Sequence, residues 1–505
     1  MNKLMTVGVC AAVAAALAFT GSAATYYAKP DGADDATCAD ETNAGSISNA
    51  IVKALTANNN TVVLLDGDYD CSGISNPTKT SYAFYLNKTI TIKSKSDNPD
   101  TVCLVGSGTM DKKKACIYTA ATVTLQALTI ANFHSSASGS GAYCGANTLT
   151  ITNCTFDSCR STASGGALYQ QYNLKLRLYN CRFRKCSSGN GNAVCYCHGG
   201  ATQAYDCEIT DCFVDNTNGG CVVYDGTWTR CTWSGCYTTG SGANAYGAVG
   251  ASAKLNNCVV SNCWCAGANG PFYKCTVTDT LICDMPKNGV YYQGSFDRCV
   301  FKDNQTYLTC NAGVLRNCLI VGNSYEAGGN PKTLVYGGTL QNNTFVGNYQ
   351  PAGTGWNRGG IVGGGTRVEN CIFAENTGSR VFASGSGSGI YLTNCLYSAG
   401  AASGSYTHAA NPVELKPVSD GVSEFDQVKF VGASDKGLPY YSLQRKSPAV
   451  DVGTNLTYTV ESVDLAGNPR VVSKGMTLAK NPNAIVDLGC YENLEPNPGL
   501  MLLLR

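Results

Sequence analysis

Two nine-residue stretches, ITNCTFDSC (residues 151–159) and LYNCRFRKC (178–186), display the unit from which most of this 505-residue chain is built. The unit returns with a mean period of about 24 residues, and a fixed period of this length indicates a solenoid of stacked supersecondary units. The further copies are AYDCEITDC (204–212), WTRCTWSGC (228–236), LNNCVVSNC (255–263), FYKCTVTDT (272–280), FDRCVFKDN (296–304), LRNCLIVGN (315–323), LQNNTFVGN (340–348), VENCIFAEN (368–376) and LTNCLYSAG (392–400).

The columns of this repeat alternate in polarity as short strands do. Positions one and six are apolar or aromatic, whereas positions five and seven are polar or variable, which is the period of a half-buried strand. Position three is Asn in seven copies, and Asn tolerates the left-handed backbone of a bend between two strands. We therefore predict an all-β, right-handed parallel β-helix of about 14 coils, spaced about 4.8 Å apart. An antiparallel β-sandwich array is the alternative, which the short period and the rarity of hairpin turn signals disfavour.

The ends of the chain predict an export signal and two caps. Residues 1–24 combine Lys3, an apolar run and a stretch of small residues, which is typical of a secretory signal peptide. A membrane anchor is the alternative, but the run is short, and no later segment holds 18 consecutive apolar residues, so we expect no transmembrane span. The remaining layout is an N-terminal cap with a short helix near 46–57 (25–59), the β-helix (60–400), a C-terminal segment capping it (401–492) and a tail (493–505).

Charge and cysteine content narrow the function classes. The chain has 36 Lys and Arg against 35 Asp and Glu, so it lacks the long-range field with which proteins attract nucleic acid. It has 28 cysteines, which fill position four in ten copies and position nine in the first five. Cysteines stacked in one column have parallel Cβ vectors, so we predict mostly buried free thiols. Zinc is the alternative, for which the local cluster Cys195–His198 is the best candidate.

Three groups of side chains are candidates for a binding or catalytic site. Alternation along the strands predicts that an acidic group and a basic group face outward, the first able to hold Ca²⁺ and the second an acidic glycan. Exposed aromatic residues can stack on sugar rings. The acidic group is Asp206, Glu208, Asp211, Asp215 and Asp225, the basic group is Lys175, Arg177, Arg182, Arg184 and Lys185, and the aromatic residues are Tyr291, Tyr292 and Trp356.

Parts of the chain resemble two families of β-helix proteins. Phe301–Asn304, Phe345–Asn348, Phe373–Asn376 and Gly165–Leu168 resemble repeats of chlamydial polymorphic outer-membrane proteins. Tyr27–Gly32 and Val62–Tyr69 look like the first coil of secreted pectin-lyase-like proteins, and Ser447–Gly453, Asp464–Arg470 and Asp487–Glu492 are similar to a terminal signature of such proteins. The resemblance implies the fold, but these families contain lyases, hydrolases and noncatalytic surface proteins.

Two function classes remain open. Glycosidases of this fold need paired carboxylates, which we do not find within the repeat, and His198-Gly199-Gly200 matches a polygalacturonase motif only in part. We therefore expect an exported cell-surface or secreted protein that binds a polysaccharide or a host or cell-surface ligand without catalysis. The alternative is a polysaccharide lyase or glycoside hydrolase that acts on an acidic polysaccharide. The sequence assigns no catalytic residue and no cofactor, with Ca²⁺ as the one candidate ion.

Overall fold

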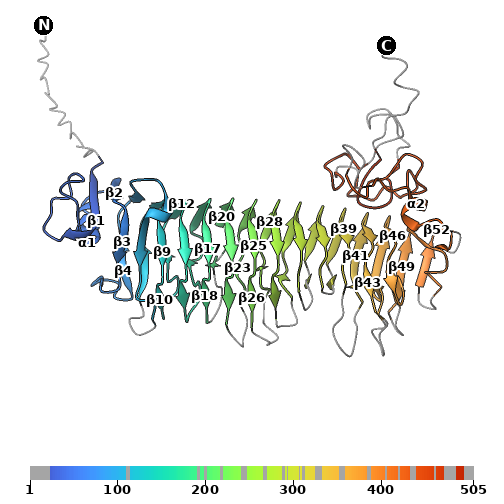
Figure 1. The fold of residues 1–505 in the computed structure, drawn as a ribbon, viewed down its shortest axis with the longest axis horizontal. Helices are drawn as coiled ribbons and strands as arrows, with labels where there is room; N and C mark the ends of the chain where they lie inside the picture. The colour runs from blue at the N-terminus through green and yellow to red at the C-terminus, as the bar shows by residue number, and fades with distance from the viewer. Residues whose placement is uncertain are drawn as a thin grey trace, which may run out of the picture.

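The chain folds into a long rod of stacked coils, shown by a computed structural model (Figure 1). The predicted signal peptide, up to residue 22, and the end of the tail lie outside the described residues. The structure describes residues 23–109, 114–189, 194–197, 199, 202–215, 220–239, 247–265, 270–286, 291–292, 294–305, 308–309, 313–324, 333–351, 359–383, 388–403, 407–418, 421–432, 439–459, 462–470 and 485–493.

Two long parallel sheets run the length of the rod. Sheet A has 16 strands, from β1 (Thr25–Ala33) to β51 (Thr407–Ala410), and sheet B has 15 strands, from β3 (Gly67–Asp70) to β52 (Val413–Leu415). Each coil contributes one strand to each sheet, which confirms the predicted parallel β-helix with slightly different coil numbers from the 14 expected.

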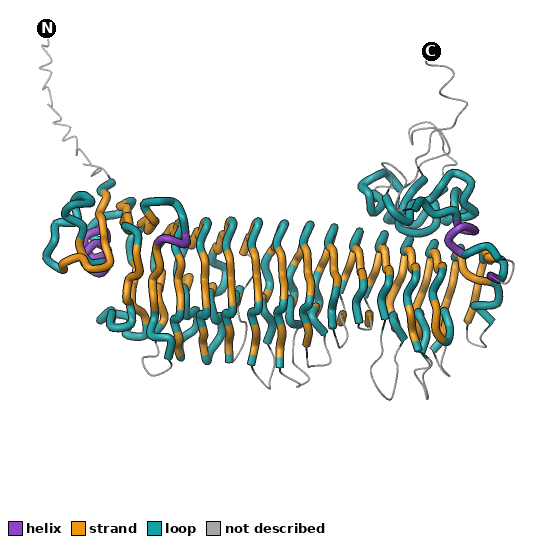
Figure 2. Tube along the Cα trace, viewed as in Figure 1, coloured by secondary structure: helices purple, strands orange, loops and turns teal. Residues whose placement is uncertain are grey.

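Four shorter sheets close the coils: sheets C and D in the earlier coils, and a four-stranded and a two-stranded sheet in the later ones. The nine-stranded sheet C includes β4 (Tyr82–Leu86) and β34 (Tyr291–Tyr292) as its outer strands, and the six-stranded sheet D runs from β10 (His134–Ser135) to β30 (Trp264–Cys265). Neighbouring strands in these sheets are parallel and belong to successive coils, as in sheets A and B. The strands are short and joined by tight bends, which Figure 2 shows as alternating strand and loop along each coil.

One coil illustrates how the repeat folds. Strand β16 (Lys175–Tyr179) of sheet A ends at Asn180, whose φ of 51° turns the chain into β17 (Arg182–Arg184) of sheet B. All seven position-three asparagines adopt φ between 48° and 54°, which confirms the predicted left-handed bend. Leu178, Cys181 and Phe183 point inward and are completely buried. The rod therefore has one continuous core formed by positions one, four, six and nine.

One copy of the repeat was assigned the wrong register. Strand β32 (Thr276–Thr278) pairs with β28 (Lys254–Asn256) so that Val277 lies beside Leu255, which occupies position one. The unit therefore spans 277–285, with Thr280 in position four and Met285 in position nine. The sequence pattern instead predicts Cys275 in position four and Thr280 in position nine. The error arose because the next coil is short and the Cys-x-apolar pattern is also present at Cys275, which lies before the strand.

The change from cysteine to asparagine in position nine has a structural reason. The thiol of Cys186 donates to the Phe156 carbonyl of the preceding coil at 3.5 Å, and the Asn323 amide donates to the equivalent Phe301 carbonyl at 2.9 Å. Asn323 also accepts the backbone N–H of Asn304 at 3.1 Å. Both residue types thus pair the same buried carbonyl, and buried carbonyls require a partner.

The cysteines that the structure describes are free thiols and, except for Cys103 and Cys283, they are buried. Burial raises the pKa of Cys154 and of Cys275 to about 12, which keeps these thiols protonated. They therefore act as small core residues with a weak hydrogen-bond donor.

A short helix covers the N-terminal coil as predicted. Helix α1 (Ile47–Ala54) begins after Ser46, whose hydroxyl accepts the N–H of Asn49 at 3.2 Å. Its apolar face buries Ile47, Ala50, Ile51 and Ala54. None of the helices in the described part of the chain is long and apolar enough to cross a membrane.

The C-terminal segment packs on the side of the rod as well as near its end. Helix α2 (Glu424–Val428) contacts β52 and β46 (Ile372–Ala374), and the chain that follows covers the outer face of sheet B over the last coils (Figure 1). The position-three asparagines hold this segment: Asn342 donates to the Asp487 carbonyl at 3.2 Å and Asn370 to the Thr454 carbonyl at 2.8 Å. The bend asparagines of the last coils therefore also bind the C-terminal segment to the rod.

The terminal signature residues form a buried charge cluster within this segment. Arg470 is completely buried, donates to the carbonyls of Asp487 and Gly489 at 3.1 and 2.9 Å, and lies 3.4 Å from a Glu492 carboxylate oxygen. The Asp464 carboxylate accepts the backbone N–H of Asn468 at 2.7 Å. Burial raises the pKa of Asp487 to about 6 and that of Glu492 well above its usual value. The signature therefore has a structural role, joining the motifs of this segment to one another.

Candidate functional site

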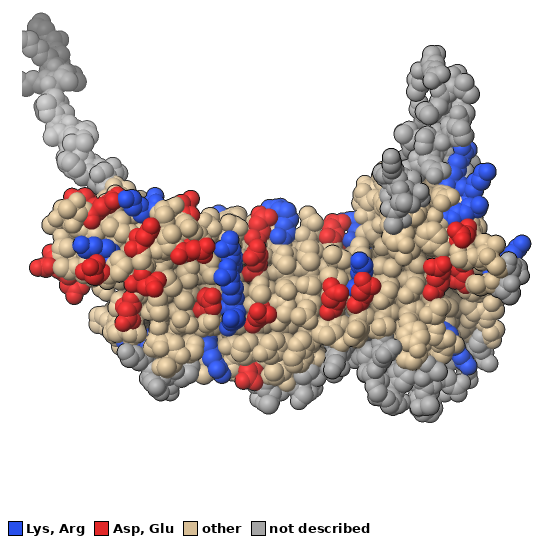
Figure 3. All heavy atoms as spheres, in the orientation of Figure 1, with Lys and Arg blue, Asp and Glu red and all other residues tan. Residues whose placement is uncertain are grey.

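Basic side chains of one coil form a band across the outside of the rod. Lys175 and Arg177 alternate with buried leucines on β16, and Arg182 and Arg184 flank buried Phe183 on β17, with Lys185 at the following bend. We call these five residues the basic band. Figure 3 shows basic side chains aligned as a stripe across the middle of the rod, with acidic side chains on both sides.

Most of the basic band is open to solvent and to a ligand. Arg182 lies 3.9 Å from both Asp100 and Glu208, which is a loose ion pair in each case. Within the described residues, no ion pair joins the other four members of the band to a carboxylate. Exposed charges of this kind attract a polyanion, and dissolved salt screens that attraction.

The part of the band on sheet B, Arg182 and Arg184, lies on an open stretch between two raised segments. On the N-terminal side, the loop that contains η1 (Pro99–Thr101) is held to the rod by Thr129, which donates to the Pro99 carbonyl at 2.7 Å. On the C-terminal side, Cys490 and Tyr491 cover the rod at Leu319. Between them Val259 of sheet B remains 38% exposed. Figure 1 shows both segments rising above the central coils.

The predicted acidic group is dispersed over separate local contacts. Both carboxylate oxygens of Asp206 accept hydrogen bonds from Arg230 at 2.7 Å, which lowers the pKa of Asp206. Glu208 faces Arg182, Asp215 accepts from the Thr239 hydroxyl at 3.1 Å, and Asp225 accepts from the N–H of Gly226 at 2.7 Å. Asp211 occupies a left-handed bend with φ of 53°. Among the described residues, no group of three or more His, Cys, Asp or Glu could hold a metal ion.

The side chains of the predicted aromatic residues lie outside the described part of the structure. The backbone of Tyr291 and Tyr292 forms β34 in sheet C, but their side chains, together with Trp356 and His198, lie outside the described structure.

A different aromatic feature was missed from the sequence: a column of tyrosines on the outside of sheet C. Neighbouring rings from Tyr118 to Tyr224 stack with centroids 4.7 to 5.4 Å apart. We call this column the tyrosine ladder; it includes Tyr118, Tyr143, Tyr169, Tyr196 and Tyr224. Because each ring covers the face of the next, the ladder stabilises coil stacking and leaves mainly ring edges to solvent. The signal in the sequence was an apolar residue followed by Tyr once per coil.

A second stack, formed by Phe213, Tyr237 and Trp264, lies outside sheet D with successive centroids 5.1 Å apart. It begins one coil after the basic band, because Phe213 is the register partner of Ser187. Aromatic and basic side chains thus lie on neighbouring coils of the rod.

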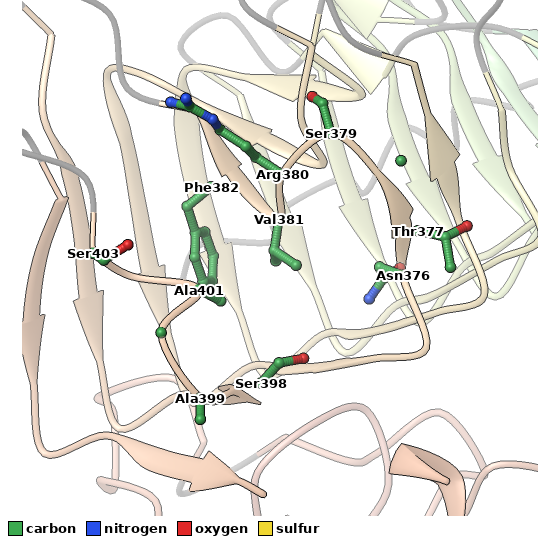
Figure 4. Close-up of a pocket in the computed structure, with 12 residues that line it drawn as sticks. Asn376, Thr377, Ser379, Arg380, Val381, Phe382, Ser398, Ala399, Ala401 and Ser403 are labelled. Atoms are coloured by element: carbon green, nitrogen blue, oxygen red, sulfur yellow. The ribbon is translucent and has the colours of Figure 1, made fainter. Parts of the chain in front are cut away.

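A cavity of about 550 Å³ lies beside the last coils. Figure 4 shows Phe382 and Val381 within it and Arg380 at its edge. Several of its polar groups already have partners: the Asn376 amide donates to the Phe345 carbonyl at 2.8 Å, and the hydroxyls of Ser398 and Ser379 bond to Glu424 and to the Gly359 carbonyl. The cavity therefore offers fewer free polar groups than its lining suggests.

Comparison with known proteins agrees with the fold. Residues 109–264 match the family model described as "Right handed beta helix region". The match covers less than half of the chain, and the sheet topology shows that the parallel β-helix extends beyond it on both sides. No curated protein matches this chain.

Solved structures with some similarity to this chain include polysaccharide-cleaving enzymes. The chain is 12% identical to the PL6 family alginate lyase AlyGC over 77% of its own length, with a TM-score of 0.41, and spans about half (53%) of that structure. It is 13% identical to pectate lyase Pel9A over 93% of its length and 96% of that chain, with a TM-score of 0.27. It is 11% identical to the catalytic domain of a GH87 α-1,3-glucanase over 73% of its length and 67% of that chain, with a TM-score of 0.33. At such identities and TM-scores we take neither fold nor function from these structures.

Proposed function

We propose that this protein is exported and binds an acidic polysaccharide on the outside of its β-helix, without cleaving it. The observation that carries the proposal is the basic band, in which five cationic side chains of one coil follow each other over two adjoining sheets. Successive outward residues of a strand are about 6.7 Å apart, so the band presents charge at short regular intervals to an extended anionic chain.

The shape of the surrounding surface supports an extended ligand. The η1 loop and the C-terminal segment flank the band, and the stretch between them is open sheet. Arginine is suited to this role because its planar guanidinium pairs with a carboxylate through two parallel hydrogen bonds. The ligand class that fits is therefore a polymer with regularly spaced carboxylates, such as a polyuronate.

A lyase or hydrolase is the second candidate, and one observation favours it. Charged side chains from three neighbouring coils meet on sheet B, where Asp157 is the register partner of Arg184 and Arg182 is the partner of Glu208. A base and a cation on adjacent coils are parts that polysaccharide cleavage can use.

Incubation with polysaccharides separates the two functions. The mature protein is mixed with alginate, polygalacturonate and a neutral glucan, and both binding and product formation are followed. We expect binding to the two polyuronates that weakens with added salt, and no products. Unsaturated products that absorb in the ultraviolet would show a lyase, and absence of binding to both polyuronates would reject the proposed ligand class.

Export is tested separately from binding. The proposal that residues 1–24 are a signal peptide predicts that the secreted chain begins near Thr25 or Tyr26. N-terminal sequencing of protein recovered from outside the producing cells checks this start. Retention of Met1 in that protein would contradict it.

A further inference from the structure

Two cysteines of sheet C approach each other closely inside the rod. The sulfur atoms of Cys195 and Cys197 are 2.9 Å apart, and both side chains are completely buried. They point inward on either side of Tyr196, because residues two apart on a strand share a face. Nonbonded heavy atoms prefer a separation of about 3.5–4.0 Å, so these two sulfur atoms are already in tight contact.

We propose that Cys195 and Cys197 form a disulfide bond across Tyr196 when the chain folds in the presence of an oxidant. The thiolate of one cysteine attacks a small-molecule or protein disulfide and forms a mixed disulfide with it. The second thiolate then displaces that group. The two cysteines lose two protons and two electrons as the sulfur–sulfur bond forms, and the oxidant is reduced to two thiols.

The backbone geometry allows this bond. Cα atoms two residues apart on a strand are separated by about 6.6 Å, which is inside the usual range of about 4.4–6.8 Å for disulfides. Strand β19 (Cys195–Tyr196) ends at Tyr196, so Cys197 lies beyond the strand, where small backbone adjustments do not break a ladder. A closed loop of only three residues strains the bond.

The cysteines of the repeat columns are arranged differently. Cys186 and Cys212 belong to successive coils about 4.8 Å apart with parallel Cβ vectors. Each donates its S–H to the position-six carbonyl of the preceding coil, at 3.5 and 3.6 Å. A disulfide between them would remove both donors. We therefore expect oxidation at the Cys195–Cys197 pair rather than between Cys186 and Cys212.

The bond would lie directly beneath the tyrosine ladder. The ring of Tyr196 stacks between those of Tyr169 and Tyr224, with centroids 5.2 and 5.4 Å away. Closing a bond between the residues on either side of Tyr196 fixes the backbone at the centre of the ladder. This redox site does not depend on glycan binding.

The test maps the blocked thiols. The protein is refolded in a glutathione redox buffer, denatured without reductant, alkylated and fragmented for mass spectrometry. We expect the fragment with Cys195 and Cys197 to carry no alkyl group at either position and to gain two after reduction, while Cys186 and Cys212 are alkylated from the start. Alkylation of both Cys195 and Cys197 before reduction, or a link from either one to another cysteine, would overturn the proposal.

Two variants provide controls for this measurement. Cys197→Ala should leave Cys195 open to alkylation, whereas Cys207→Ala, in a repeat column, should leave the Cys195–Cys197 link unchanged. Loss of the link in Cys207→Ala would contradict a bond confined to this pair. If a variant fails to fold, the alkylation pattern of the wild-type protein decides the proposal by itself.

Discussion

Asp206 and Arg230 occupy the same bend position in successive coils, and two hydrogen bonds of 2.7 Å join their side chains. Asn fills this position in most coils. The same substitution recurs three coils later, where Arg298 pairs with Asp279 through bonds of 2.7 and 2.9 Å. Within the eleven copies of the repeat, departures from asparagine thus come as neighbouring pairs of opposite charge. This explains why an apparent acidic cluster in the sequence contains a structural ion pair.

This relationship predicts how substitutions at the bend behave. Replacing both Asp206 and Arg230 by Asn should leave the melting temperature nearly unchanged, because Asn tolerates the left-handed backbone and the ion pair is exposed. Arg230→Val should lower it, because a β-branched residue in this conformation costs on the order of 1–3 kcal/mol. Thermal unfolding followed by circular dichroism compares them, and equal melting temperatures for the Val and Asn variants would refute the bend assignment.

The asparagine column predicts a larger effect in the core. Asn348 accepts the N–H of Asn323 at 3.0 Å and donates to the Ile320 carbonyl at 2.9 Å. Asn348→Ala leaves both buried backbone groups unpaired, at a cost of about 1–3 kcal/mol for each group. Cys236→Ala removes only a weak donor, so it should cost clearly less. Urea unfolding midpoints measure the difference, and a Cys236→Ala loss as large as that of Asn348→Ala would argue against this role.

The buried carboxyl groups predict a pH dependence of the C-terminal segment. Folding raises the pKa of Asp487 from its usual value to about 6, so its protonated form favours the folded state. This contribution is complete below the unfolded pKa and is lost as pH rises through the folded value. A shift of this size corresponds to about 3 kcal/mol. Limited proteolysis should therefore release the segment more slowly at pH 5 than at pH 8.

Two variants test whether the pH dependence of proteolysis arises from Asp487. Asp487→Asn should reduce the difference between pH 5 and pH 8, whereas Glu414→Gln, on the exposed face of β52, should leave it intact. A wild-type segment that is cleaved faster at pH 5 would contradict the raised pKa values of Asp487 and Glu492.

Much of the fold was predictable because each coil repeats the same physical requirements. Apolar side chains in positions one and six, and asparagine at the Asn153 and Asn180 bends, define strands and turns locally. The register of 277–285 was missed because coil length varies, and a pattern cannot show which strand a cysteine such as Cys275 precedes.

The candidate site was only partly predictable. Alternation placed Arg182 and Arg184 on one outward face, as the structure shows. The docking of Tyr491 and Cys490 against sheet B depends on contacts between residues more than a hundred positions apart, as in the 3.0 Å bond from the Cys490 N–H to the Thr344 hydroxyl. No local pattern contains such information, so the open stretch around the basic band emerges only from the folded chain.

The most direct measurement of the central claim is polyuronate binding by variants of the basic band. Arg182→Ala combined with Arg184→Ala should weaken binding by about tenfold or more, which corresponds to about 1.4 kcal/mol. Lys302→Ala is the matched control, since Lys302 lies in the same outward column of sheet B as Arg184 but five coils away. Calorimetry at low and moderate salt should give the control the wild-type affinity. Equal affinity of the double variant and the wild type would contradict the account.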